Sequence, residues 1–422
     1  MQKYLVYIVV SLIIGLMIGS GITFALAGTA APQQTASPSV APQQMALPSE
    51  VPIGALLPLS GALSTFGEKW KHSLELAEED INAYVSRLGL DVKFKIYVED
   101  TKTSPEGALA ALQTLSAKGI KLVVGPAASS EVAAVKSHAD ANKIVIFSPS
   151  STAPQLAIKD DYIFRAVTSD VYQGKALARL MWEKGVRKVV VMYRGDDWGV
   201  GLFDVIKARF EELGGQVEGV KYDPEAPELS TEVRRVSDYV KEFGADEETG
   251  VLFISFEDDG LNILSLAKED PALTKVKWFG TDGIAYSTKI AKQVGDVVES
   301  LGVLATVYLP EESPKKEQFK ERYKERFGVE PDPYTYNIYD AVWVLALAVL
   351  EAGKYDGEVV AKVLPEVASR YFGVSGWVLL DEAGDRVGER YVITTVVSEN
   401  GEFVWKDVGV YISPLDKVEL ST

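Results

Sequence analysis

Cysteine is absent from the 422 residues, and histidine occurs only as His72 and His138. The missing thiols exclude disulfides, thiolate catalysis, cysteine-rich zinc sites and a lipid-modified cysteine anchor. Because the chain has only two histidines, an imidazole-rich metal site or a histidine-based catalytic triad is not expected. The chain also has no excess of positive charge, because its formal net charge is −17 and its sequence pI is ≈ 4.8. Nucleic acid and anionic lipid surfaces are therefore not expected as main partners.

Motifs of phosphate binding and covalent catalysis are also missing. The chain contains no GxxxxGK[ST] loop and no GxSxG nucleophile elbow. Gly199–Gly201 lacks the third glycine of a dinucleotide fingerprint, and the acidic run Glu257–Asp259 is typical of solvated or helix-capping side chains rather than of a metal site. We therefore expect a protein that is not an enzyme and that needs neither a metal nor a cofactor.

One long apolar run is present, at the N-terminus. Tyr4 to Leu26 contain no charged residue, and a helix of about 23 residues spans about 35 Å, enough for a hydrocarbon core of about 30 Å. Its length predicts an uncleaved membrane anchor over residues 1–27, with a signal peptide cleaved after Ala25-Leu26-Ala27 as the alternative. Residues 28–50, rich in Ala, Pro, Gln and Ser, predict an extended tether. The folded body is then expected outside the cytoplasm, at the cell surface.

From Val51 onward, strand and helix patterns alternate. Strands are predicted at Val51–Leu57, Val92–Val98, Leu122–Val124 and Ile144–Phe147, and, after a crossing near Tyr162–Thr168, at Lys188–Met192, Val217–Val220, Val251–Ile254 and Val276–Phe279. The helices predicted between them include Gly67–Arg87, Glu131–Ala141, Tyr172–Glu183, Val200–Leu213, Ser230–Phe243 and Leu261–Ala267. Repeated βαβ units require a parallel sheet with helices on both faces.

The remaining patterns complete two lobes, the number expected from the chain length. Helical patterns at Pro314–Phe327 and Pro333–Ala352 indicate a return to the first lobe, and Trp377–Leu380, Tyr391–Val397 and Phe403–Tyr411 are predicted as antiparallel strands of the second lobe. The predicted fold class is α/β, with two doubly wound parallel-sheet lobes. Lobe 1 is assigned residues 51–168 and about 307–375, and lobe 2 residues 169–306 and about 376–415.

Two strand ends carry small hydroxyl residues. The run Ile144–Phe147 ends in Ser148–Thr152, and Leu122–Val124 leads through a short turn to Ser129 and Ser130, which are predicted as helix N-caps. Ligands of open α/β sheets bind beyond the carboxyl ends of the strands. Two such ends side by side predict an anion site, with ordinary capped turns as the alternative.

Six segments follow one another in a specific order: IGALLPLSGALSTFGEKW, VVGPAASSEVAAV, SPSSTAPQL, FRAVTSD, YRGDDWGVGLFD and WFGTDG. Together they resemble the substrate-binding proteins of branched-chain amino acid ABC transporters, over about Val51 to Tyr411. The resemblance implies a type I periplasmic-binding-protein fold, in which three crossing segments join two lobes that close on a ligand. It also implies ABC permease subunits as partners.

The resemblance further implies roles for individual residues. Ser129 matches the position that holds the amino acid carboxylate, and Ser150 and Thr152 match positions that contact both the carboxylate and the ammonium. Asp282, in WFGTDG, matches the acidic position that pairs with the ammonium from the opposite lobe; a turn aspartate before Gly283 is the alternative. The positions that line the pocket walls are matched by Phe66, Trp198, Phe256 and Tyr334.

These observations predict an extracytoplasmic solute receptor of an ABC importer that binds a neutral, branched-chain amino acid. The aromatic wall positions favour an apolar ligand side chain, and no Arg or Lys occupies a matching position, which argues against an acidic one. Three alternatives stay open: a receptor for an amide, an aromatic acid or a signal molecule, a sensory ectodomain, and a tethered α/β enzyme.

Overall fold

The structure is a computed structural model that describes residues 47–388 and 390–421. The predicted membrane segment, residues 1–27, and nearly all of the predicted tether lie outside these residues. Among the helices of the described residues, none combines the length and the apolar character needed to cross a bilayer.

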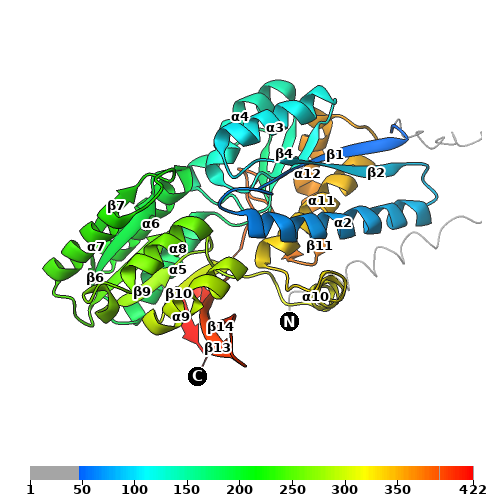
Figure 1. Cartoon of the computed structure of the whole chain (residues 1–422). Coiled ribbons are helices and arrows are strands. Elements are labelled where there is room, and N and C mark those ends of the chain that lie inside the picture. The colour runs from blue at the N-terminus through cyan, green and yellow to red at the C-terminus, as the bar shows by residue number, and fades with distance from the viewer. Residues whose placement is uncertain (1–46, 389, 422) are drawn as a thin grey trace, which may run out of the picture. The chain divides into compact units, whose positions relative to one another are not determined.

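Five parallel strands form the first sheet. Their order is β2 (Lys93–Asp100), β1 (Glu50–Leu57), β3 (Leu122–Val124), β4 (Val145–Ser148) and β5 (Ile163–Arg165). Side chains alternate between its two faces: Val123 packs in the layer of α3 (Pro105–Ala117) and α4 (Ser129–Asn142), whereas Val124 packs in the layer of α2 (Ser64–Arg87) and α11 (Pro333–Ala352). Figure 1 shows these two helical layers on opposite faces. Helix α12 (Gly357–Ser369) packs against α11 and β4.

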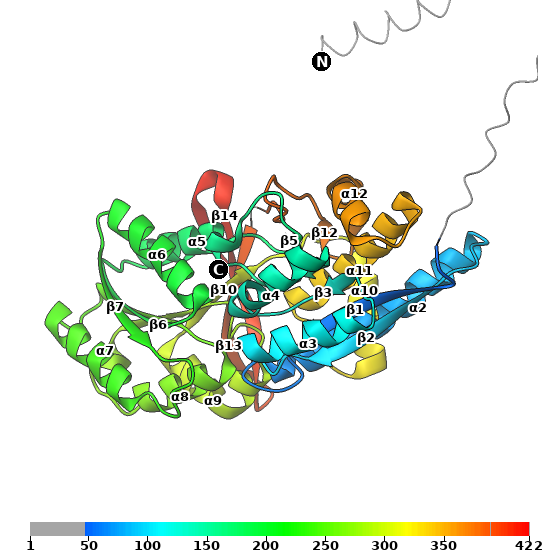
Figure 2. The same cartoon turned by 90° about the horizontal axis from the view of Figure 1, so that it is seen from above.

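The second sheet has eight strands. Their order is β15 (Lys417–Leu420), β14 (Glu402–Ile412), β13 (Arg390–Glu399), β10 (Leu304–Tyr308), β9 (Lys277–Gly280), β8 (Thr249–Ile254), β6 (Lys188–Arg194) and β7 (Gln216–Tyr222). Strands β6 to β10 are parallel, and β13 to β15 continue the sheet as antiparallel strands. Figure 2 shows α5 (Asp170–Glu183) and α6 (Asp197–Glu212) on one face, and α7 (Ser230–Phe243), α8 (Glu257–Ala267) and α9 (Thr288–Leu301) on the other.

The chain passes between the two sheets three times: after β5, after β10 towards α10 (Pro314–Phe327), and after β12 (Gly376–Trp377). A buried ion pair joins the first passage to the third, because Arg165 binds Asp385 and also donates to the Ala153 carbonyl at 2.8 Å. The predicted α/β class is confirmed, while the residue boundaries of the two lobes stay a prediction.

The prediction of Trp377–Leu380 as a strand of the second sheet is wrong. Of this run only Trp377 belongs to a strand, β12, which pairs with β11 (Phe372–Gly373) in a separate two-stranded ladder, and Leu380 forms an isolated antiparallel bridge with Arg386. Trp377 is exposed and packs edge-on against Phe372, while Val378 is fully buried at the third passage. Val378 is the only buried side chain of the run, because Leu379 is exposed as well, so these apolar residues do not mark a strand of the second sheet.

Candidate functional site

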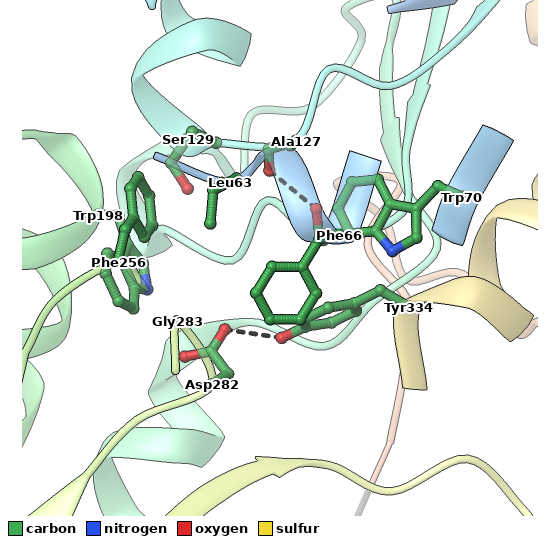
Figure 3. Close-up of a pocket in the computed structure, with 12 residues that line it drawn as sticks. Leu63, Phe66, Trp70, Ala127, Ser129, Trp198, Phe256, Asp282, Gly283 and Tyr334 are labelled. Carbon is green, nitrogen blue, oxygen red and sulfur yellow. Dashed lines mark hydrogen bonds between the residues drawn. The ribbon is translucent and has the colours of Figure 1, made fainter. Parts of the chain in front are cut away.

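A cavity lies where the carboxyl ends of strands from both sheets meet (Figure 3). It is lined by Leu63, Phe66, Trp70, Ala127, Ala128, Ser129, Ser150, Trp198, Phe256, Asp282, Gly283 and Tyr334. Apart from Tyr334, at the start of α11, these residues follow β1, β3, β4, β6, β8 and β9. The cavity volume is ≈ 40 Å³, far below the roughly 300–1,000 Å³ of ordinary ligand pockets, so a ligand must widen the cavity as it binds.

Seven of the eight predicted site residues line this cavity, and Thr152 does not. The Thr152 hydroxyl donates to Asp170 Oδ2 at 2.9 Å, and its N–H points to Ser129 Oγ at 3.3 Å. Thr152 therefore lies behind Ser129 and supports it. The roles assigned to the seven lining residues remain predictions.

Ser129 is the first residue of α4 and has 1% exposure. Its Oγ accepts the hydroxyl of Ser151 (3.1 Å) and the N–H groups of Thr152 (3.3 Å) and Ala153 (3.2 Å), so its own proton remains to be donated. Ser150 has the opposite arrangement, because its hydroxyl donates to the Ala127 carbonyl at 2.9 Å and its lone pairs remain to accept. One serine can thus serve an anionic group and the other a cationic one.

The prediction of Ser129 and Ser130 as N-caps is wrong. Ala128 is the N-cap of α4, and its N–H donates to Glu131 Oε2 at 2.8 Å. The Glu131 side chain closes the start of the helix, so the Ser129 hydroxyl has no capping duty. The first-turn N–H groups and the positive helix end still lie at the cavity wall, where they favour an anion.

Asp282 lies on the opposite side of the cavity, after β9, with 6% exposure. The Tyr334 hydroxyl donates to its Oδ2 at 2.7 Å (Figure 3), and Gln173 Nε2 donates to its Oδ1 at 3.0 Å. The next residue must be glycine, because a Cβ at Gly283 would lie 2.2 Å from the Ser255 carbonyl oxygen and 2.7 Å from the Trp198 ring.

A second buried carboxylate, Asp170, was missed by the sequence analysis. It is fully buried in the first turn of α5, and within the described residues its Oδ1 has no hydrogen-bond partner. Burial, and then the charge of Asp282, raise the pKa of Asp170 well above its ordinary value. Burial also raises the pKa of Asp282, against the lowering effect of its bonds from Tyr334 and Gln173. In the sequence segment FRAVTSD, Asp170 directly follows Ser169, and an acidic residue at this place is common at the start of any helix. The segment therefore gives no sign that Asp170 lies near the ligand site.

Aromatic rings make up most of the remaining wall. Trp198 and Phe256 are stacked, with ring centroids 4.9 Å apart and planes 13° apart. Trp70, also missed by the sequence analysis, meets Tyr334 edge-on at 6.2 Å. Burial, followed by the charge of Asp282, raises the pKa of Tyr334 well above 10, so its phenol stays a neutral donor. No lysine or arginine is among the lining residues, so the wall favours an uncharged, apolar ligand group.

Comparison with known proteins adds three findings. A family model described as "Receptor family ligand binding region" matches residues 69–399. An uncharacterized protein of Methanocaldococcus jannaschii is 35% identical over 87% of this chain and 90% of its own length, and a Leu/Ile/Val-binding protein homolog of Brucella abortus is 26% identical over 81% and 89%. A crystal structure of a leucine-binding protein from Thermotoga maritima matches with a TM-score of 0.71 and 24% identity, over 87% of this chain and all of that one. This structural likeness shows a type I periplasmic-binding-protein fold.

Proposed function

The chain belongs to the receptor family defined by this ligand-binding region, and from that premise we propose that it is the solute receptor of an ABC importer and binds a neutral, branched-chain amino acid. The family comprises ligand-binding receptor domains rather than enzymes. The names of the Brucella and Thermotoga proteins support an aliphatic amino acid as ligand. The chemistry of the cavity supports it independently.

The observation that carries the proposal is the pair of buried carboxylates, Asp170 and Asp282. Their like charges disfavour each other, and no basic residue lines the cavity. The nearby guanidinium of Arg165 is already bound to Asp385. A ligand ammonium supplies the missing positive charge, and in a buried site such a charge pair is strongly favoured over an uncompensated carboxylate.

The opposite wall suits a carboxylate. Ser129 can donate its hydroxyl proton, and the N-terminus of α4 offers N–H groups and a positive dipole end. Neutral donors can hold an anion without leaving a buried cation when the site is empty. The rings of Phe66, Trp198 and Phe256 then surround an apolar side chain.

Binding is coupled to closure of the two lobes. An amino acid held by Ser129 from the first lobe and by Asp282 from the second stabilises the closed state over the open one. The closed form is then recognised by ABC permease subunits. The apolar segment Tyr4–Leu26 tethers the receptor to the membrane, with the folded body outside the cytoplasm.

The test is the melting temperature of the full-length protein with leucine, with two truncated analogues, and with a panel of amino acids, amides and aromatic acids. 4-Methylpentanoate lacks the amine of leucine, and 3-methylbutylamine lacks its carboxylate. A ligand selective for the folded state must raise the melting temperature, and we expect only the complete amino acid to do so. An equal shift with 4-methylpentanoate, or a shift with amides or aromatic acids but with no amino acid, would contradict the proposal.

A further inference from the structure

A second, larger cavity adjoins the ligand cavity. It measures ≈ 300 Å³, against ≈ 40 Å³ for the ligand cavity. Its lining is mainly polar and includes Lys102 and Asn262. The two cavities meet at the aromatic wall, because Phe256 lines the first, Arg194 lines the second, and the Arg194 guanidinium lies 4.0 Å from the centroid of the Phe256 ring.

Phe256 is therefore in contact with two flat groups. Its ring stacks on the Trp198 ring, with the centroids 4.9 Å apart, and the guanidinium of Arg194 lies over the Phe256 ring. Figure 3 shows Trp198 and Phe256 side by side, across the cavity from Phe66 and Tyr334. A long or aromatic ligand side chain that reached this wall would have to displace Phe256, and with it the stack.

Arg194 itself is firmly held. It is the last residue of β6, has 7% exposure, and donates its Nε to Asp196 at 2.8 Å and its Nη1 to Asp259. Asp196 caps α6 by accepting the Gly199 N–H at 2.9 Å. Asp259 accepts the N–H of Phe256 at 3.3 Å. The two counter-ions thus belong to the starts of the helices that carry Trp198 and Phe256.

We propose that Arg194 is a positioning residue that limits the size of the ligand's side chain. It holds Phe256, and through Phe256 also Trp198, as a wall that admits compact aliphatic groups and closes off the larger cavity. A buried ion pair by itself is weak support for stability, since well-packed apolar residues often replace it without loss. The guanidinium has a second role here, because it lies over the Phe256 ring, 4.0 Å from the ring centroid, while its N–H groups bind two carboxylates. The inference rests on the proposed function, since it takes an amino acid as the ligand.

The test is the ratio of leucine to phenylalanine affinity, measured by calorimetry on the full-length protein. The parent is expected to prefer leucine, and Arg194→Met and Phe256→Ala are each expected to lower that preference at least about tenfold by strengthening phenylalanine binding. Arg194→Lys keeps the charge but loses the flat group, so it should restore stability without restoring the preference. Arg187→Met is the matched control, because the Arg187 guanidinium also lies over an aromatic ring, 3.8 Å from the centroid of Trp182, and lines neither cavity.

The ratio separates positioning from stability. A variant that is only destabilised binds both ligands more weakly and leaves the ratio of leucine to phenylalanine affinity unchanged. Phe256→Ala tests the aromatic wall even if Arg194→Met does not fold. Leucine binding by the parent with a ratio unchanged within about threefold in Phe256→Ala and Arg194→Lys would overturn the inference alone. A parent that binds neither ligand would overturn the proposed function and the inference with it.

Discussion

Replacing Asp282 by asparagine should remove most of the affinity for an amino acid. The change keeps the size of the side chain and removes only its charge. Asp282 is 6% exposed, so water does little to screen its interaction with a ligand ammonium. Truncating one partner of a buried, hydrogen-bonded charge pair costs about 2–5 kcal/mol. Because Asp170 remains as a second carboxylate, we expect a loss of about 3 kcal/mol, or roughly a hundredfold in Kd.

The assay is calorimetric titration of leucine into the parent and the variant. Asp296→Asn serves as the control, because it makes the same chemical change at an exposed position of α9 and should leave Kd unchanged. The melting temperature without ligand should fall little, because neutralising residue 282 relieves the repulsion felt by Asp170. A Kd for Asp282→Asn within about threefold of the parent would refute the proposed pairing with the ammonium.

Three further predictions concern charge. Because the pKa values of Asp170 and Asp282 are raised in the ligand-free protein, leucine binding should release protons, and the affinity for leucine should fall as the pH is lowered through those pKa values. Calorimetry in buffers of different ionisation enthalpy measures the proton release. A Kd that does not depend on pH would contradict this prediction. The same shifts mean that these two groups lower the stability of the ligand-free protein as the pH rises from about 4 through their folded pKa values. Arg165→Met leaves Asp385 buried without its cation and should cost about 3–5 kcal/mol in denaturant unfolding; the Arg165→Met/Asp385→Leu double variant should recover much of it, and equal losses in both would show that the pair is not the cause.

Much of the fold could be predicted because its signals are local. Buried strands such as Leu122–Val124 and Val251–Ile254 show as short β-branched runs. Helix starts were placed too late, as at Gly67 instead of Ser64 and Leu261 instead of Glu257, since polar first turns carry no apolar periodicity. The strand predicted at Trp377–Leu380 failed because a short apolar run does not show its pairing partner: Trp377 pairs with β11 in a separate ladder, and both Trp377 and Leu379 are exposed.

The site was predictable only in part. Ser129 and Ser150 could be found because small hydroxyl residues follow buried strands within a short turn, and parallel strands bring their carboxyl ends to one edge. Thr152 follows the same buried strand as Ser150, but its hydroxyl donates to Asp170 and does not line the cavity. Asp170 itself carries no local mark that distinguishes it from a common first-turn acid.

By itself, the sequence determined the α/β class, the parallel direction of the strands within each βαβ run and the chemistry available at the strand ends, because periodicity and turn chemistry act over a few neighbouring residues. Only the tertiary structure decided which charges face each other. Asp170 and Asp282 lie 112 positions apart, and Arg194 meets Phe256 from a different strand. Such contacts depend on how the two sheets and their crossing segments pack, and long-range packing sets both the raised pKa values of the carboxylates and the wall that shapes the cavity.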